Sequence, residues 1–313
     1  MKIDVLSIGA FPPGMMQTLH DRFTVTEFRA CPPAQSIDPA LAERVRAIAT
    51  EANRGVTREL IAILPKLEII ACFGVGVDAI DLAAARERNI PVTNTPGVMA
   101  DDVADLAIGL MLASSRQIIA AERFVRDGRW AAGPITLARQ VTGKRLGVLG
   151  LGGIGRAIAD RAAAFKMQVR YSGPRRKPDA PYEFVADPVE LARGSDFLMV
   201  ACKGGPETRH LVSAPMIEAL GPAGTLINVA RGTVVDEAAL IRALKAGKLG
   251  FAALDVFENE PHVSPELLAL PNVLVQPHHG SATVETREAI GRLVIANIVA
   301  QFERRPLPTP VTR

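Results

Sequence analysis

The sequence predicts an α/β protein built from two units, and three observations support this fold class. The chain has 313 residues, which is enough for about two domains. From Lys144 onward, short apolar runs alternate with helical patterns, as in a doubly wound parallel sheet with crossover helices. The third observation is a G-x-G-x-x-G spacing at Gly150, Gly152 and Gly155, placed between a strand pattern and a helix pattern.

The composition limits the classes of protein that need to be considered. Hydrophobic residues make up 48% of the chain and charged residues 22%, which suits globular domains with sizeable cores. A net charge of +3 is too small to indicate nucleic-acid binding, and Cys31, Cys72 and Cys202 have neither disulfide-framework nor metal-ligand spacing. Residues 1–9 read as a strand, and the apolar stretch 106–115 is too short to span a bilayer. We therefore expect a cytoplasmic protein with no metal, membrane or nucleic-acid partner.

The N-terminal part reads as a small α/β unit of about 95 residues. Strands are expected at 2–8, 24–28, 45–49 and 67–73, and helices at about 14–23, 57–63 and 79–88. Gly74 and Gly76 follow the last of these strands. Their turn either presents backbone N–H groups to a small anion, such as a carboxylate, or is a plain glycine-rich turn. The segment 94–97 (Asn-Thr-Pro-Gly) then breaks the pattern and is a candidate hinge.

Two helices, at 100–115 and 117–126, precede the regular alternation. Aspartates at the start of the first helix suit the helix dipole, so no catalytic role is assigned to them. Further strands are expected at 145–149, 167–171, 195–201, 225–229, 251–254 and 273–275, and helices at about 154–165, 187–193, 213–220, 236–246 and 284–303. Asp187, Pro188 and Glu190 predict a capping box at the start of one of them.

The glycine loop indicates a dinucleotide site. Backbone N–H groups at a helix N-terminus can hold a pyrophosphate when a strand, a glycine turn and a helix follow one another. Gly150 would allow the tight turn, Gly152 would let the cofactor approach the backbone, and Gly155 would let the helix pack on its strand. An ordinary strand–helix turn is the alternative, and the context favours the cofactor. The predicted site comprises Gly150, Leu151, Gly152, Gly153, Ile154 and Gly155.

Polar residues follow three neighbouring strands at their carboxyl ends, where ligands bind in open parallel sheets. Arg231 follows strand 225–229, Glu260 follows strand 251–254, and His278 follows strand 273–275. An arginine can hold a carboxylate with two parallel hydrogen bonds. A histidine can pass a proton near neutral pH, and a carboxylate beside it orients the ring and favours the imidazolium. These residues predict a site that protonates a carbonyl in an acidic substrate.

Three segments resemble the signatures of the D-isomer-specific 2-hydroxyacid dehydrogenases: Asn-Val-Ala-Arg-Gly at 228–232, Asp-Val-Phe-Glu-Asn-Glu-Pro at 255–261, and Pro-His-His-Gly-Ser-Ala-Thr at 277–283. With the glycine loop and segment 206–210, the similarity covers essentially the whole chain. The resemblance implies two Rossmann- or flavodoxin-like domains with the active site in the cleft between them. The substrate-binding domain would comprise 1–98 and 283–313, and the dinucleotide-binding domain 99–282.

The resemblance also implies roles for the matching residues. Arg231 would bind the carboxylate and carbonyl oxygen of a 2-oxo acid, His278 would donate the proton, and Glu260 would hold and polarise His278. Val75 and Gly76 match the loop whose N–H groups grip the substrate carboxylate. Further positions predicted to contact the cofactor are Ser172, Arg175, Arg176, Cys202, Thr208, Val229, Ala230, Arg231, Asp255, His278 and Gly280.

Several nearby residues have either an undecided role or no expected catalytic role. Asp255 either supports the nicotinamide side or anchors its turn. His279 is adjacent to His278, but neighbours on an extended segment point in opposite directions, so we do not expect it to share the chemistry. The remaining histidines are expected to be surface or packing residues, namely His20, His210 and His262.

The end of the strand after the glycine helix bears on cofactor choice. An NAD site usually has an acid there for the ribose 2′-OH. Here Ser172 stands at that place, and Arg175, Arg176 and Lys177 follow. A 2′-phosphate would bind these arginines, so we predict NADP(H) and a reductase that uses NADPH. A loop of solvated basic residues is the alternative.

The closest resemblance within the family is to glyoxylate, hydroxypyruvate and hydroxyphenylpyruvate reductases, so reduction of glyoxylate or hydroxypyruvate to the D-2-hydroxy acid is predicted. Glu260 disfavours formate dehydrogenases, and we expect no C-terminal extension of the phosphoglycerate dehydrogenase kind. Segment 201–206 departs from the usual family turn. The alternatives are a bulkier 2-oxo acid, such as phenylpyruvate or a branched-chain one, and a non-catalytic dinucleotide-sensing corepressor. A homodimer through 99–143 is also implied, with Trp130 either at the partner's pocket or packed between domains.

Overall fold

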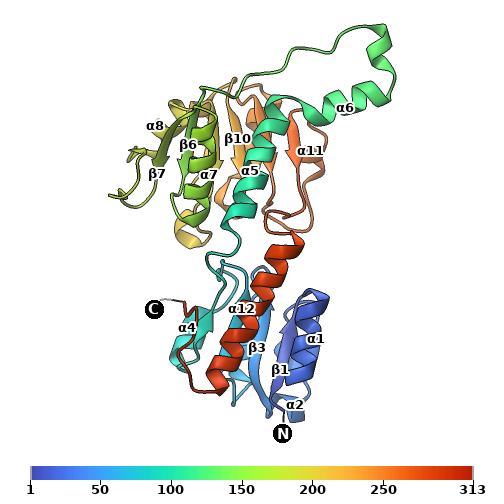
Figure 1. Ribbon diagram of the computed structural model, residues 1–313, viewed down its shortest axis with the longest axis vertical. Coiled ribbons are helices and arrows are strands. Elements are labelled where there is room, and N and C mark those ends of the chain that lie inside the picture. The colour runs from blue at the N-terminus through green and yellow to red at the C-terminus, as the bar shows by residue number, and fades with distance from the viewer. Residues whose placement is uncertain (1, 312–313) are drawn as a thin grey trace. The chain divides into compact units, whose positions relative to one another are not determined.

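The computed structural model describes residues 2–311 and divides into two compact units. Unit 1 comprises Met1–Met99 and Ala282–Arg313, and unit 2 comprises Ala100–Ser281. Each unit contains one parallel sheet with helices on both faces (Figure 1), which confirms the predicted fold class.

Unit 1 is built on a five-stranded parallel sheet with strand order β2-β1-β3-β4-β5. Its strands are β1 (Asp4–Ile8), β2 (Thr24–Phe28), β3 (Val45–Glu51), β4 (Ile69–Phe73) and β5 (Val92–Thr93). Its helices are α1 (Pro13–Arg22), α2 (Pro39–Ala42), α3 (Arg58–Ala62), α4 (Leu82–Glu87) and α12 (Val284–Phe302), with a 3₁₀ turn at Ala34–Ser36.

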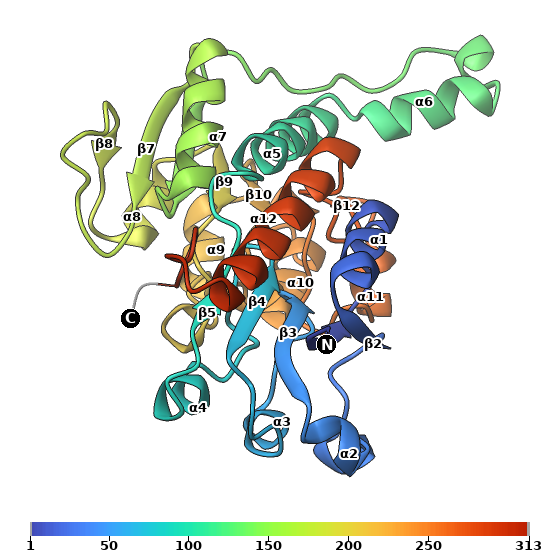
Figure 2. The same cartoon turned by 60° about the horizontal axis from the view of Figure 1, so that its bottom comes forward.

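The apolar runs of β1 and β4 are buried on both faces, as expected for the centre of a parallel sheet. Leu6, Ile48 and Ile70 form one core with Leu60 of α3 and Ala84 of α4. On the other face α12 packs on β4 and on α1. Figure 2 shows α3 and α4 on the side of the strands opposite α12. Two separate helical layers therefore exclude water from this sheet.

Unit 2 is built on a seven-stranded parallel sheet with strand order β12-β11-β10-β9-β6-β7-β8. Its strands are β6 (Arg145–Leu149), β7 (Gln168–Ser172), β8 (Glu183–Phe184), β9 (Phe197–Val200), β10 (Thr225–Asn228), β11 (Phe251–Leu254) and β12 (Val273–Val275). The chain winds outward from β6 to β8 and then resumes at β9 on the other side of β6. Strand order reverses there, so the carboxyl ends of β6 and β9 form the switch point at which such sheets bind ligands.

The helices of unit 2 cover both faces of this sheet. They are α5 (Ala100–Ser115), α6 (Ile118–Arg126), α7 (Gly153–Ala164), α8 (Pro188–Arg193), α9 (Ala214–Leu220), α10 (Glu237–Lys245) and α11 (Pro265–Leu268), with 3₁₀ turns η2 (Arg129–Ala132), η3 (Pro206–Thr208) and η4 (Gly232–Val234). α5 and α7 pack together and are linked by Arg161, which pairs with Asp101 and Asp105. The aspartates assigned to the helix dipole thus also bind a neighbouring helix.

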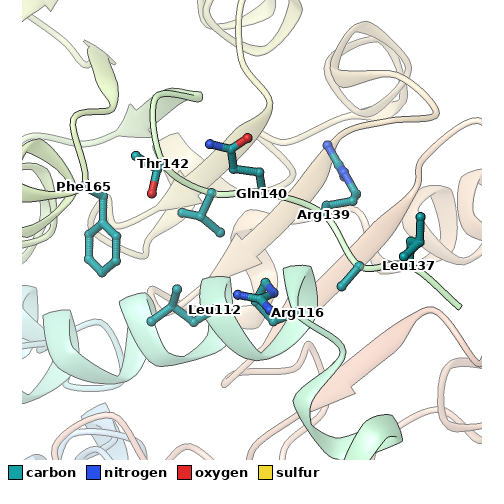
Figure 3. A pocket seen from close by; sticks show the side chains of 9 residues that line it. Leu112, Arg116, Leu137, Arg139, Gln140, Thr142 and Phe165 are labelled. Carbon is teal, nitrogen blue, oxygen red and sulfur yellow. The ribbon is translucent and has the colours of Figure 1, made fainter. Parts of the chain in front are cut away.

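The helix α6 and the segment after it extend away from the sheet of unit 2 (Figure 1). We call residues 117–138 the arm. No residue of α6 is buried, and the exposed apolar side chains of the arm are Ile118, Ile119, Val125, Trp130, Ile135 and Leu137. At the base of the arm, Leu112, Arg116, Arg139 and Phe165 help to line a hollow of about 490 Å³ (Figure 3). None of the predicted site residues lines this hollow.

No single helix among residues 2–311 has both the length and the apolar character that a membrane span requires. The pair α5 and α6, bent by 57° at the break between them, meets that criterion only when both are taken together.

Two local predictions were wrong. The capping box at α8 forms only in part: the Asp187 side chain accepts from the N–H of Val189, but Glu190 pairs with Arg193. Since Arg193 lies one turn away on the same face, it competes for the carboxylate that would otherwise reach back. The segment at His278 is also not extended, because this residue has a φ of +54°.

Candidate active site

The glycine loop turns sharply between β6 and α7. Gly150 has a φ of +97°, and a Cβ at this position would lie 2.5 Å from Cα of Cys202. A Cβ at Gly155 would lie 2.0 Å from the carbonyl oxygen of Gly150. Both positions therefore require glycine, the first for its conformation and close approach and the second for helix–strand packing.

The loop leaves the N-terminus of α7 open to an anion. A Cβ at Gly152 or Gly153 would meet nothing within 4 Å, and Gly152 at the N-cap provides no side-chain hydrogen bond to the helix. The first N–H groups of a helix have no partner within the helix, and they attract negative charge. The open backbone at the switch point thus fits a dinucleotide pyrophosphate.

The strand next to this loop ends without an acid. Ser172 is the last residue of β7, is 2% exposed, and accepts a hydrogen bond at its carbonyl oxygen from the N–H of Gly150. Arg175 and Arg176 follow in an exposed segment. Neither guanidinium has a hydrogen bond or ion pair within residues 2–311. Two uncompensated cations therefore lie beyond β7, beside the glycine loop.

His278 and Glu260 form a close pair. Nδ1 of His278 lies 2.7 Å from Oε2 of Glu260, and Oε1 of Glu260 accepts from the N–H of Phe257 at 3.0 Å. Burial by itself would raise the pKa of the Glu260 carboxyl. The hydrogen bond and charge of His278, the N–H of Phe257 and the charge of Arg231 outweigh burial and lower this pKa below its ordinary value. Glu260 is therefore an anion that orients the imidazole.

Asp255 anchors the turn that carries His278. Its carboxylate is 2% exposed and accepts from the N–H groups of His279 at 2.6 Å and Gly280 at 2.9 Å, while its carbonyl oxygen accepts from the N–H of His278. Burial raises the pKa of Asp255 against the opposing effect of these N–H donors. The structure thus supports the turn-anchoring alternative for Asp255.

Arg231 lies at the end of the neighbouring strand, in the loop between β10 and η4. Asn228 fixes this loop through hydrogen bonds to the carbonyl oxygen of Arg231 and the N–H of Ala230. A Cβ at Gly232 would lie 1.8 Å from the carbonyl carbon of Phe257. The loops after β10 and β11 therefore pack backbone against backbone, and this brings Arg231 near Glu260 and His278.

The sequence did not predict a cluster of charged and polar groups around Glu258, beside these loops. Oε1 of Glu258 accepts from Arg209 at 2.8 Å and lies 2.9 Å from Nε2 of His210. The N–H of His210 donates to the carbonyl oxygen of Thr233. His210, expected to be a surface or packing residue, thus ties the loop after β9 to those after β10 and β11. The sequence alone does not show that His210 lies beside segment 255–261, because the two meet only when the sheet is folded.

The other positions predicted to contact the cofactor lie after β9, β10 and β12. Burial raises the pKa of the Cys202 thiol to about 11, so this cysteine is neutral near neutral pH. The Thr208 hydroxyl donates to the carbonyl oxygen of Lys203 at 2.7 Å and so closes the loop. Val229 and Ala230 are buried at the end of β10, and Gly280 packs near Asp255.

Val75 and Gly76 belong to unit 1 and follow β4. The carbonyl oxygen of Val75 accepts from Asn94, and that of Gly76 accepts from the Cys72 thiol. Gly74, with a φ of +140°, is fixed by two hydrogen bonds with Thr95. In the part of the chain that the structure describes, the N–H groups of Val75 and Gly76 donate to no protein group, which leaves them available to an anion.

Comparison with known proteins identifies the family. Residues 108–280 match the model of the D-isomer specific 2-hydroxyacid dehydrogenase NAD-binding domain. The chain belongs to the D-isomer-specific 2-hydroxyacid dehydrogenases. As a member of this family it is an oxidoreductase with a Rossmann-like domain for a nicotinamide dinucleotide.

Similar members of this dehydrogenase family are reductases. The chain is 46% identical to hydroxyphenylpyruvate reductase of Plectranthus scutellarioides and 45% identical to glyoxylate/hydroxypyruvate reductase A of Arabidopsis thaliana, each over 99% of both chains. A solved NADPH-dependent glyoxylate/hydroxypyruvate reductase of Sinorhizobium meliloti, in complex with NADP and malonate, is 39% identical. It matches with a TM-score of 0.95 over 100% of this chain and 97% of that one.

Proposed function

We propose that this dehydrogenase reduces a small 2-oxo acid, glyoxylate or hydroxypyruvate, to the D-2-hydroxy acid with NADPH. The observation that carries the proposal is the His278–Glu260 pair at 2.7 Å, next to Arg231 at the carboxyl edge of one sheet. His278, the proposed proton donor, follows β12, and Arg231, the proposed carboxylate-binding cation, follows β10, two strands away in the same sheet, on the side of the glycine loop.

Substrate binding is assigned to cationic and N–H donors. The Arg231 guanidinium would hold the substrate carboxylate and carbonyl oxygen through two parallel hydrogen bonds, which also fixes the substrate's orientation. Val75 and Gly76 stay predicted contacts of the carboxylate, and their unpartnered N–H groups support this role. A positive charge near the carbonyl oxygen also stabilises the negative charge that develops there during reduction.

Proton transfer is assigned to His278. Because Nδ1 is held by Glu260, the donor to the carbonyl oxygen would be Nε2. A nicotinamide held at this site would supply the hydride to C2, and the proton from His278 would complete the hydroxyl group. Glu260 stabilises the imidazolium before transfer and keeps its ring in place.

The preference for NADPH is supported by the end of β7. Ser172 offers no carboxylate to repel a 2′-phosphate, and the unpaired guanidinium groups of Arg175 and Arg176 offer charge-assisted hydrogen bonds to it. The relative from Sinorhizobium meliloti is an NADPH-dependent reductase, which agrees with this assignment.

A bulkier 2-oxo acid is the second candidate substrate. It is favoured by the relative named hydroxyphenylpyruvate reductase, which has a slightly higher identity than the glyoxylate/hydroxypyruvate reductase. The same residues would perform the same chemistry on it, so the two candidates differ only in the substrate side chain.

We also propose a homodimer formed through the arm. α6 has apolar side chains but no buried residue, and Trp130 is 68% exposed. Several exposed apolar side chains on one projecting segment are typical of a protein interface. The cytoplasmic location stays a prediction from the sequence.

The test is a set of initial rates with NADPH and NADH against glyoxylate, hydroxypyruvate, phenylpyruvate and 2-oxoisocaproate. Fastest oxidation of NADPH with the small acids is expected. Equal rates with NADH would contradict the cofactor assignment, and faster turnover of phenylpyruvate or 2-oxoisocaproate would replace the substrate. Dinucleotide binding without any turnover would contradict the enzymatic proposal and favour a corepressor.

A further inference from the structure

The exposed basic segment between β7 and β8 is fixed by several side-chain contacts to β7 and α7. It leaves the sheet at Ser172 and returns at Glu183, where β8 pairs in parallel with β7. We call residues 173–182 the basic crossover, because it carries Arg175, Arg176 and Lys177. Its base is closed by the register Arg170 with Glu183 and by the packed rings of Tyr171 and Phe184, 5.3 Å apart.

The middle of the basic crossover is fixed from below by the sheet. Tyr171 is buried in β7, and its hydroxyl oxygen accepts from the N–H of Lys177 at 2.7 Å. Since this bond joins the residue directly after Arg175 and Arg176 to an immobile strand, it limits where the backbone of both arginines can lie.

Two further contacts bind the returning limb to α7. Arg156 pairs with Asp179 at 2.7 Å, and the Tyr182 hydroxyl donates a hydrogen bond to Asp160. Arg156 and Asp160 are four residues apart on α7, so they lie on one face of the helix. Burial and the bond to Asp160 raise the pKa of Tyr182 to about 12, so Tyr182 keeps its proton and stays a donor.

These contacts also determine which charges of the basic crossover are paired within the protein. Asp179 is the one acid of the basic crossover, and Arg156 neutralises it. The guanidinium groups of Arg175 and Arg176 have no protein partner in the described part of the chain. The negative charge that the basic crossover itself carries is therefore bound to α7 and not to these arginines.

We propose that Tyr182, Asp160, Arg156 and Asp179 are positioning residues for cofactor selectivity: they tie the basic crossover to the glycine-loop helix and so hold Arg175 and Arg176 where a 2′-phosphate binds. The inference rests on the proposed use of NADPH. None of these four residues is assigned to touch the cofactor. Pre-organisation of the arginines reduces the side-chain and loop ordering that binding would otherwise require.

The test measures the dissociation constants of NADP⁺ and NAD⁺ by calorimetry, without substrate, for the wild type, Tyr182→Phe and Asp160→Asn. Tyr182→Phe removes the hydrogen bond to the Asp160 carboxylate, so NADP⁺ should bind about fivefold more weakly, which corresponds to about 1 kcal/mol. Asp160→Asn should weaken NADP⁺ binding less, because the amide oxygen can still accept from Tyr182. NAD⁺ affinity should stay at the wild-type value, because NAD⁺ has no 2′-phosphate.

A matched control is Asp105→Asn, which removes a different contact of α7, the one between Asp105 and Arg161. It should change neither dissociation constant. A second control is Tyr182→Phe added to a protein that already carries Arg175→Gln and Arg176→Gln. If Tyr182 acts through the arginines, the added change has no further effect on NADP⁺ binding.

The outcomes separate the inference from the proposed function. Equal weakening of NADP⁺ and NAD⁺ by Tyr182→Phe, or no weakening by either variant, would overturn the inference and leave NADPH use intact. Tight NAD⁺ binding together with no effect of Arg175→Gln and Arg176→Gln would overturn NADPH use itself, and the inference with it.

Discussion

At His278 the backbone has a φ of +54°, a conformation that costs a residue other than glycine about 1–3 kcal/mol. The surrounding bonds hold it there: Asp255 accepts from the backbone of the two residues that follow, and Glu260 holds the imidazole. The result is a histidine whose main chain and ring are both fixed from outside. Such fixed geometry is what a proton donor needs, since small displacements reduce its efficiency.

The Glu260 carboxylate should make acid stability depend on pH. Its pKa in the folded protein is below the ordinary value of 4.5, so its stabilising contribution is fully present above about pH 4.5 and is lost as the pH falls through the folded value. Urea denaturation from neutral pH down to about pH 3 should show a steeper loss of unfolding free energy in the wild type than in Glu260→Gln. Parallel curves for the two proteins would contradict this account.

At the scale of elements, the glycine loop and α7 combine tight packing with an open N-terminus. Gly155 packs against the backbone of Gly150, and Gly152 and Gly153 face open space. Adjacent glycines of one loop therefore serve different physical purposes, which allows a matched pair of substitutions.

Gly155→Ala should destabilise the protein and weaken dinucleotide binding. Its Cβ would lie 2.0 Å from a carbonyl oxygen, and such overpacking typically costs about 1–3 kcal/mol. Gly153→Ala, which meets nothing within 4 Å, is the control and should keep the wild-type melting temperature. Differential scanning calorimetry with and without NADP⁺ measures both effects. An unchanged melting temperature for Gly155→Ala would refute the packing argument.

The sequence predicted the elements that have strong local patterns. Thr24–Phe28, Ala100–Ser115 and Arg145–Leu149 have the predicted bounds, because their apolar residues repeat at strand or helix spacing. The missed elements are short. β8 has two residues, Glu183–Phe184, and it is a strand only because it pairs with β7. α2 and α11 have four residues each, too few to show a period.

The candidate site was predictable for a similar reason. Arg231, Glu260 and His278 follow three strands, and carboxyl ends of parallel strands meet at one edge. The contact of Glu258 with Arg209 joins residues 49 positions apart, and no local pattern marks it. The positive φ of His278 was equally hidden, since it is imposed by bonds from Asp255 rather than by residue type.

At the scale of the whole molecule, most of the large apolar side chains that are exposed to solvent lie in the arm. Ile118 and Val125 are 49% and 55% exposed, and they are seven residues apart, on one face of α6. α6 contacts α5 and η2, but none of its residues is buried, so the proposed homodimer interface would cover this apolar face.

Replacing Ile118 and Val125 together by Asp should convert a dimer into a monomer. With a chain mass of 33.3 kDa, sedimentation should give about 67 kDa (2 × 33.3) for the wild type and about 33 kDa for the variant. Leu268→Asp changes an equally exposed apolar residue outside the arm and should leave the dimer intact. A monomeric wild type would exclude the arm as a homodimer interface.

The measurement that tests the central claim most directly is kcat for NADPH oxidation with hydroxypyruvate, compared between the wild type, His278→Ala and His279→Ala. Loss of the proposed proton donor should lower kcat roughly 10²- to 10⁴-fold in His278→Ala, a far larger change than in the dissociation constant for NADP⁺. His279→Ala should keep wild-type turnover, since its contact with Asp255 is made by the backbone N–H. Wild-type turnover in His278→Ala would contradict the proposed reaction mechanism.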